Sequence, residues 1–277
     1  MRILITGAKG QLGQAVIPYL ANHDLTLVDL PEMDITDKTA VFHTFAQAQP
    51  EIVIHCAAYT NVDGCAKDPA LAYKVNALGS QNIALACLDY EAEMVHISTN
   101  EVFAGDNPAG YEEWMTRDPI NGYGRSKAAA ENLVQHILQR AYIVRTAWLY
   151  APGGRNFIHA ILDRARTQGN LRVVADEIGS PTYANDLAQA LAQLIETHQY
   201  GIYHFTNAGS CSRWQFANEI LRQAELTHVT NTPILSREFK RASTPPPYGV
   251  IHNMAGAAIG ITLRPWQEAL AEYLRDQ

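Results

Sequence analysis

The chain has 277 residues, of which 47% are hydrophobic and 18% charged, a composition that predicts a soluble globular domain with length to spare for a smaller lobe. The formal net charge of -7 argues against nucleic acid or an anionic membrane surface as the main partner, and no apolar run reaches the ~18 residues of a membrane span. The four cysteines have no CxxC spacing and the ten histidines form no HxxxH pair, so we expect reduced thiols, a cytoplasmic location and no catalytic metal.

The first segment combines a strand, a glycine-rich turn and a helix. Arg2–Thr6 is a short apolar run typical of a buried strand, and Gln11–Ala21 has the amphipathic pattern of a helix. Between the strand and the body of the helix stand Gly7, Gly10 and Gly13. Glycines allow positive φ and let a pyrophosphate approach the main chain, while the helix N-terminus offers free N–H groups. This order predicts dinucleotide binding, and the alternative is a tight turn without a ligand.

The second predicted strand, Asp24–Leu30, bears on the choice of cofactor. It contains Asp29, sixteen residues after Gly13. A carboxylate there can accept hydrogen bonds from the adenosine ribose and favours NAD. Lys9, inside the glycine turn, can pair with a 2′-phosphate and favours NADP. Because the two signals conflict, the sequence leaves NADH and NADPH both open.

The third predicted strand ends in small residues. Asp34 and Asp37 are expected to cap a helix over Lys38–Gln47, and a buried strand follows within Glu51–Tyr59. The end of this strand lies at the carboxyl edge of the sheet, where ligands bind in open α/β folds, and its small residues leave space for a flat ligand. The residues at that edge are Ala57, Ala58 and Tyr59.

The next stretch continues the alternation of strands and helices. We expect a polar loop over Asn61–Lys67 and one long helix over Asp68–Cys87, with an apolar stripe formed by Leu71, Val75, Leu78, Ile83 and Leu85. The later elements are a strand over 94–98, an irregular stretch over 105–121, a helix over 123–139 and a strand over 142–146. This alternation predicts an α/β fold, a Rossmann-like doubly wound parallel sheet with helices on both faces.

Beyond Trp148 the alternation loosens. We therefore expect an NAD(P)-binding Rossmann domain over residues 1–150 and mainly a smaller substrate-binding lobe over 151–277, with some segments returning to the Rossmann domain. Helices are expected over 156–167, 186–197, 213–224 and 265–274, and strands over 171–175 and 201–206. The proline-rich segment Thr244–Tyr248 is expected to be irregular.

Tyr123 and Lys127 stand at positions i and i+4 of a predicted helix and therefore share one face. A cation beside a phenol lowers the pKa of the phenol. Such a tyrosine can donate a proton to a carbonyl oxygen or accept one from a hydroxyl. Thr99, which follows the preceding strand, can hydrogen-bond the same substrate oxygen. The alternative is an ordinary surface pair and a strand-end threonine.

Several short motifs carry a resemblance that covers nearly the whole chain: GAKGQLG, HCAAYTNVD, ISTNEVF, YGRSK, VRTAW, NF and GSPT. In this order they resemble the extended short-chain dehydrogenase/reductase superfamily and, within it, the dTDP-4-dehydrorhamnose reductase family. The resemblance implies a Rossmann domain with a small sugar-nucleotide lobe. It also implies hydride transfer from NADPH or NADH to C4 of a dTDP-4-keto-6-deoxyhexose in dTDP-rhamnose biosynthesis. The implied partner is a small nucleotide sugar, and a homodimer is compatible with the resemblance.

The resemblance also implies roles for individual residues. Cofactor contacts fall to Gly7, Gly10, Gln11, Leu12 and Gly13 at the pyrophosphate, Asp34 and Ile35 at the adenine, Ala57, Ala58 and Tyr59 at the nicotinamide, and Lys127 at its ribose. Thr99 and Tyr123 would bind O4 of the sugar, with Tyr123 as the proton donor. Contacts with the rest of the substrate fall to Asn100, Trp148, Asn156 and Phe157. The alternative for Trp148 is core packing.

Two departures from the family pattern leave other functions open. Where the family usually has STDYVF, this chain has STNEVF. Glu101 is similar to the proton-abstracting glutamate of nucleotide-sugar 4,6-dehydratases, but Asn100 replaces its acid partner, so we expect Glu101 to be a loop residue or to lie behind the site. Near the C-terminus, Pro245 stands where the family has an arginine for the diphosphate, and Arg241 or Arg155 are candidate substitutes. The alternatives are a non-catalytic NADP-binding regulatory subunit and a 4,6-dehydratase-like or epimerase-like enzyme.

Overall fold

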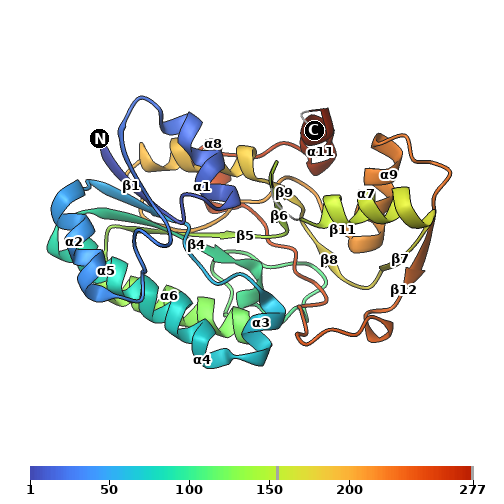
Figure 1. Cartoon of the computed structure of the whole chain (residues 1–277), viewed down its shortest axis with the longest axis horizontal. Coiled ribbons are helices and arrows are strands. Elements are labelled where there is room, and N and C mark those ends of the chain that lie inside the picture. Colours follow the sequence, from blue (N-terminus) through green and yellow to red (C-terminus); the bar gives the residue numbers. More distant parts are fainter. Residues whose placement is uncertain (154–155, 276–277) are drawn as a thin grey trace.

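A six-stranded parallel sheet forms the centre of the molecule, as a computed structural model shows for residues 1–153 and 156–275. The strand order is β10-β5-β4-β3-β1-β2 (Figure 1). The strands are β1 (Arg2–Thr6), β2 (Asp24–Val28), β3 (Ile52–His55), β4 (Glu93–Thr99), β5 (Ala141–Thr146) and β10 (Gly201–His204). Neighbouring strands are parallel throughout, which confirms the predicted Rossmann-like α/β fold.

The direction in which the chain winds reverses between β1 and β3. From β1 the chain adds β2 on one side and then crosses over to β3 on the other. The carboxyl ends of β1 and β3 therefore border a crevice, which is the position where open α/β sheets bind ligands. The turn Gly7–Gly13 starts at this point.

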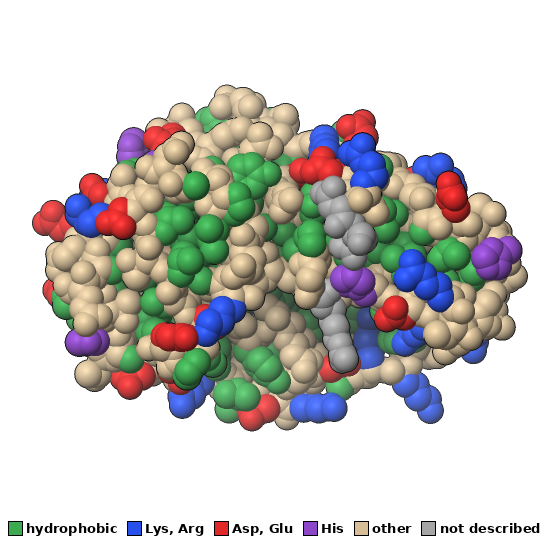
Figure 2. Space-filling view, turned by 45° about the horizontal axis from the view of Figure 1, so that its top comes forward, with side chains coloured by type: hydrophobic (Ala, Val, Ile, Leu, Met, Phe, Trp, Pro, Cys, Tyr) green, Lys and Arg blue, Asp and Glu red, His purple; other side chains and the backbone are tan. Residues whose placement is uncertain are grey.

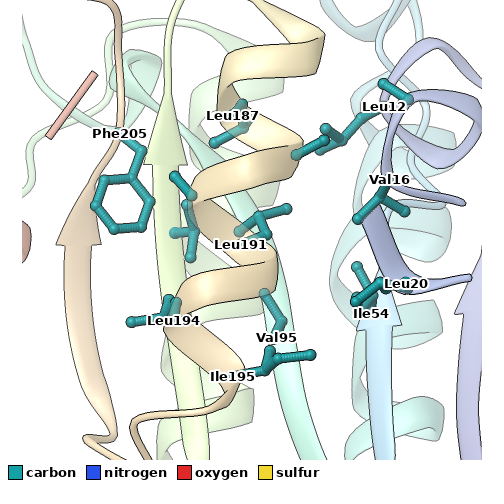
Figure 3. Close-up of a cluster of buried hydrophobic side chains, with 14 of the residues drawn as sticks. Leu12, Val16, Leu20, Ile54, Val95, Leu187, Leu191, Leu194, Ile195 and Phe205 are labelled. Carbon is teal, nitrogen blue, oxygen red and sulfur yellow. The ribbon is translucent and has the colours of Figure 1, made fainter. Parts of the chain in front are cut away.

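Helices cover both faces of the sheet. One face carries α1 (Gln11–Val16) and α8 (Ala184–Ile195), and the other carries α2 (Lys38–Ala48), α5 (Ser80–Asp89) and α6 (Gly122–Ile137) (Figure 1). Figure 3 shows leucines of α8 facing Leu12 and Val16 of α1 above strands of the sheet. These side chains are almost fully buried, and each such aliphatic side chain stabilises the fold by about 1.5–3 kcal/mol. None of the described helices is long and apolar enough to span a membrane.

A second, smaller core lies between elements of the C-terminal part. It is formed by α7 (Phe157–Gln168), β7 (Asn170–Val174), α9 (Arg213–Gln223) and α11 (Trp266–Arg275), with Val229 just before β12 (Thr230–Ile234). The short elements around it are β6 (Leu149–Tyr150), β8 (Ile178–Gly179), β9 (Thr182–Tyr183), β11 (Cys211–Ser212) and η4 (Ser236–Glu238), whereas the short helix α10 (Ala255–Ala258) packs on β10. In contrast, α8 and β10 belong to the core of the main sheet. The boundary at residue 150 stays a prediction.

Several predicted elements differ from the structure near the N-terminus and in the C-terminal lobe. The first helix is regular only to Val16 and continues as a 3-10 helix, η1 (Ile17–Leu20), because Pro18 has no N–H to donate to an α-helical bond. The predicted loop over 61–67 is wrong, since Asn61 caps a short helix, α3 (Val62–Lys67), by accepting a hydrogen bond from Gly64 N. Strand β12 was not predicted; it pairs with β7.

The predicted long helix over 68–87 is divided into three parts. These are α4 (Pro69–Ala72), a π-helix η2 (Tyr73–Gly79) and α5. The predicted apolar stripe is wrong at Leu71 and Leu78, which are exposed, whereas Ile83 is buried as predicted. The buried side is made of small or polar residues instead: Ala72, Asn76, Ala77, Gly79 and Ser80. Small residues let neighbouring elements approach closely, and a Cβ on Gly79 would lie 2.7 Å from Ile35 Cδ1.

Candidate active site

A groove of about 990 Å³ runs along the carboxyl edge of the sheet. Figure 2 shows a hollow between the two parts of the molecule, with Lys and Arg side chains more frequent over the C-terminal part. All the predicted cofactor and catalytic residues line this groove: Gly7, Gly10, Gln11, Leu12, Gly13, Asp29, Asp34, Ile35, Ala57, Ala58, Tyr59, Thr99, Tyr123 and Lys127. Asn100 and Trp148 line it as well. Of the predicted substrate residues, Asn156 and Phe157 line a separate cavity instead.

The glycine turn leaves a bare backbone surface at one end of the groove. Gly7 has φ +67, and a Cβ on it would lie 2.6 Å from Ala57 N. A Cβ on Gly13 would lie 2.3 Å from Gly7 O. Gln11 begins the helix here, and its buried Oε1 has no hydrogen-bond partner in the described part of the chain. This surface of main chain, free polar atom and helix start fits the pyrophosphate of a dinucleotide.

The charged groups beside the turn are bonded to protein atoms. Asp29 accepts hydrogen bonds from Lys9 N (2.9 Å) and Leu30 N (2.8 Å). The Lys9 ammonium forms an exposed ion pair with Glu32 at 2.8 Å. Asp34 accepts a hydrogen bond from Thr36 N, while Asp37 caps α2 as predicted. Both candidate determinants of cofactor choice are thus at the groove, and both have partners there.

Asn76 connects the edge of β3 to the helix that carries Tyr123. Its Oδ1 accepts a hydrogen bond from Tyr59 N at 2.7 Å, and its Nδ2 donates to Tyr59 O at 3.1 Å and to Ser126 Oγ at 2.9 Å. Ser126 in turn donates to Tyr123 O. This buried amide therefore fixes the 57–59 edge relative to the first turn of α6.

Tyr123 lies in the first turn of α6 beside Thr99. Burial raises the pKa of the Tyr123 phenol, the negative charge of Glu101 raises it further, and hydrogen bonding to Thr99 acts in the opposite direction. The predicted lowering of this pKa is therefore wrong for the protein without a ligand, because the cost of desolvating a phenolate dominates. The phenol is held in its protonated form, the state that a proton donor needs.

Lys127 lies one turn further along α6, and its side chain is almost fully buried. Its ammonium is 3.4 Å from Nε2 of His96. Burial lowers the pKa of Lys127 to about 8, and the carboxylate of Glu131 acts in the opposite direction. Burial and the charge of Lys127 keep the pKa of His96 well below its ordinary value, so this ring is neutral.

A buried network of ion pairs and hydrogen bonds connects this part of α6 to the sheet. Glu131 is fully buried and accepts hydrogen bonds from Ser98 Oγ (2.5 Å), Arg145 Nε (3.0 Å) and Arg117 Nη1 (2.8 Å). Arg145 Nη2 donates to its second oxygen at 2.8 Å. Through these bonds α6 is joined to β4, just before Thr99, and to β5.

The segment 244–249 is irregular, as predicted, and is hydrogen-bonded to Asn100, which lines the groove. Asn121 Nδ2 donates to Thr244 O at 3.1 Å and to Glu101 Oε2 at 2.7 Å. Asn100 Nδ2 donates to Gly249 O at 3.0 Å. Glu101 lines the groove, so the expectation that it lies behind the site is wrong. Burial raises the pKa of its carboxyl group.

A second cavity of about 430 Å³ opens in the C-terminal part. Its apolar wall includes Phe157, Phe216 and Phe239. The Asn156 amide lines this cavity but caps α7 by accepting from His159 N, and it donates to Ala151 O and Tyr273 OH. Its predicted contact with a nucleotide stays a prediction.

Arg213, which the sequence reasoning missed, lines both the groove and the second cavity. It is the first residue of α9, after Ser212, which caps the helix. Its guanidinium carbon lies 3.5 Å from the centroid of the Trp148 indole, so part of this ring is already covered. Of the two predicted substitute arginines, Arg241 forms an ion pair with Glu177, and Arg155 lies outside the described residues. Only the fold reveals Arg213, because α9 returns to the groove from far along the chain.

The described residues contain no group of three or more His, Cys, Asp or Glu side chains arranged to hold a metal ion. The chemical resources of the groove are therefore a main-chain cradle, a protonated phenol, a hydroxyl, a buried ammonium and a carboxyl group.

Comparisons with known proteins agree with this description. The sequence model of the family described as "RmlD substrate binding domain" matches residues 1–277. The chain is 40% identical to the spore coat polysaccharide biosynthesis protein SpsK of Bacillus subtilis, over 100% of this chain and 98% of that protein. It is 39% identical to dTDP-4-dehydrorhamnose reductase of Mycolicibacterium smegmatis, over 98% and 84% of the two chains. The crystal structure of dTDP-4-dehydrorhamnose reductase from Bacillus anthracis in complex with NADP superposes with a TM-score of 0.96 at 39% identity, covering 100% and 99% of the two chains.

Proposed function

Because the chain belongs to the dTDP-4-dehydrorhamnose reductase family of NAD(P)H-dependent oxidoreductases, we propose that it reduces the C4 ketone of a 4-keto-6-deoxy sugar nucleotide. One observation supports this most strongly. A single groove holds the glycine turn at one end and Tyr123, Thr99 and Lys127 beside it. The Bacillus anthracis relative binds NADP, and the bare main chain at Gly7 and Gly13 fits the same kind of cofactor here.

The residues of the groove divide the reduction between them. When bound, NADPH or NADH supplies the hydride that C4 receives. Tyr123 donates its phenolic proton to O4, so that the ketone becomes a secondary alcohol. Thr99 hydrogen-bonds the same oxygen and orients it toward the phenol. Lys127 holds the nicotinamide ribose through its ammonium, and Gly7, Gly10, Gln11, Leu12 and Gly13 hold the pyrophosphate.

The direct test is turnover by the purified protein. With NADPH and a dTDP-4-keto-6-deoxyhexose, we expect the absorbance of the reduced cofactor to fall and the corresponding 4-hydroxy sugar nucleotide to form. Tight NADPH binding without turnover of this sugar or its near relatives would favour the non-catalytic regulatory subunit instead. Formation of a 4-keto product from a 4-hydroxy sugar nucleotide, with loss of water, would favour the dehydratase.

The pH dependence of cofactor use should follow Lys127. The pKa of this ammonium is about 8, so its charge is present below pH 8 and is lost as the pH rises through that value. We expect kcat/KM for NADPH to fall above about pH 8, by up to tenfold per pH unit. Tyr123 cannot supply this change, because burial raises its pKa. The Lys127→Arg variant keeps its charge at high pH, so its profile should lack the fall. A flat wild-type profile, or the same fall in the variant, would contradict the role of Lys127.

A methyl group at position 13 should damage the cofactor site. The added Cβ of Gly13→Ala would lie 2.3 Å from Gly7 O, so the turn must shift. We expect NADPH binding to weaken about tenfold or more, the equivalent of about 1.4 kcal/mol or more. Fluorescence titration with NADPH measures this. Gly169→Ala is the control: its Cβ meets nothing within 4 Å, its φ of +68 strains the end of α7 outside the groove, and it should still bind NADPH as the wild type does. Unchanged binding in Gly13→Ala would contradict the predicted seat of the pyrophosphate.

A further inference from the structure

Arg213 occupies the junction between the groove and the second cavity. Its guanidinium stacks over Trp148 at 3.5 Å and lies 5.2 Å from the Phe157 ring centroid. When a guanidinium stacks on an aromatic ring, its N–H groups lie in the guanidinium plane and point away from the ring face. There they can donate two hydrogen bonds to an anion such as a carboxylate or a phosphate. Arg213 in this position can therefore present its donor edge to a ligand.

Arg213 has no anionic partner in the described part of the chain. It forms no ion pair within 4.0 Å there, whereas Arg241 pairs with Glu177 and Arg264 with Asp186 and Glu272. A poorly solvated cation without a partner is costly, and burial lowers the pKa of Arg213 to about 10. Such a side chain is typical of a site that receives its anion from a ligand.

The two nearby carboxyl groups do not fill this role. Glu177 is bonded to Arg241, and Glu101 is bonded to Asn121. Both favour the charged form of Arg213, and the charge of Arg241 disfavours it, but neither carboxylate is within ion-pair range of Arg213 among the described residues. The charge of Arg213 therefore stays available at the junction.

The position of Arg213 matches the middle of an extended ligand. On one side lies the groove with Tyr123, which receives the keto sugar under the proposed function. On the other side lies the cavity walled by aromatic rings, which suits a flat base. In a nucleotide sugar, the group between sugar and nucleoside is a diphosphate.

We propose that Arg213 is the residue of this chain that binds the diphosphate of the nucleotide-sugar substrate. The proposal rests on the proposed function, because it takes the keto-sugar end to lie at Tyr123. The competing anion is a phosphate of the cofactor, because Arg213 also lines the groove.

Binding measurements separate these possibilities without turnover. Isothermal titration of the full chain with dTDP, thymidine and NADPH, each alone, compares the wild type with Arg213→Gln. We expect the Kd for dTDP to rise on the order of 10- to 100-fold, the loss of charge-assisted hydrogen bonds, with thymidine and NADPH binding unchanged. Arg222→Gln is the control, because Arg222 is exposed on the same helix and pairs with Glu219; it should bind all three ligands as the wild type does.

Three results would overturn the proposal. They are unchanged dTDP binding in Arg213→Gln, a loss of thymidine binding as large as the loss of dTDP binding, and a loss confined to NADPH. If Arg213→Gln does not fold, Arg213→Lys keeps the charge but not the two-pronged geometry, and we expect an intermediate Kd for dTDP. A failure of the proposed function would give a different pattern of results. In that case dTDP binding would still depend on Arg213, but the wild-type protein would reduce no keto sugar.

Discussion

The Tyr123→Phe variant should lose about 100-fold or more in kcat while its affinity for NADPH stays close to that of the wild type. The substitution removes only the phenolic oxygen, so the aromatic ring in the first turn of α6 and its packing are retained. Because burial and Glu101 keep the phenol protonated, the wild-type group can deliver its proton to O4 as the hydride arrives. Without that proton, the alkoxide at C4 must be stabilised by Thr99 alone.

Steady-state turnover together with a separate NADPH titration checks this result. Tyr73→Phe is the matched control, because Tyr73 is 45% exposed on η2 and does not line the groove. Tyr73→Phe should leave both kcat and the affinity for NADPH unchanged. Equal losses of turnover and NADPH affinity in Tyr123→Phe would contradict a role confined to proton donation.

The Glu131→Gln variant should be destabilised by about 3–5 kcal/mol, although residue 131 does not line the groove. The carboxylate is fully buried and accepts bonds from Ser98, Arg117 and Arg145. Arg145 is 1% exposed, so the neutral amide leaves a guanidinium in the interior without compensation. The same change removes the carboxylate that favours the charged form of Lys127, and should lower the pKa of that lysine further.

Urea unfolding of the two proteins measures the change in free energy of unfolding. Glu219→Gln is the control, because its partner Arg222 is 65% exposed and exposed ion pairs contribute little to stability; its free energy of unfolding should stay close to that of the wild type. If Glu131→Gln lowered the free energy of unfolding by less than about 1 kcal/mol, the buried network would not be what holds α6 in place.

Local sequence patterns were enough to predict those parts of the site that lie within one short segment of the chain. The turn from Gly7 to Gly13 and the pair Tyr123 and Lys127 each depend on spacing within a few residues. Parallel β-strands then bring their carboxyl ends to one edge, so Thr99 and Ala57 meet these residues without further information. This is why the predicted cofactor and catalytic residues line one groove.

Features that depend on distant packing were missed. Leu71 and Leu78 have the spacing of a buried stripe, yet the neighbouring elements pack on the small residues between them. Periodicity shows which residues share a face but not which face is covered. Asn61 is an ordinary helix cap, but the six-residue helix that it caps is too short to give a periodic signal.

The charges beside the second cavity show the same limit. Arg241 and Arg213 are both arginines beside the second cavity, and the sequence does not distinguish them. Glu177 neutralises Arg241 from 64 positions away, whereas Arg213 is placed over Trp148 by the start of α9. The Tyr123 pKa likewise follows from burial in the folded groove rather than from the nearby lysine.

The position of the transferred hydride tests the central claim most directly. The wild-type protein would be given NADPH deuterated at nicotinamide C4, in separate stereospecific forms, together with a dTDP-4-keto-6-deoxyhexose, and the product analysed by NMR. We expect one of the two forms to deliver deuterium to C4 of the sugar and to no other carbon. A product without deuterium at C4 in either case, or no product at all, would contradict reduction in the groove beside Tyr123.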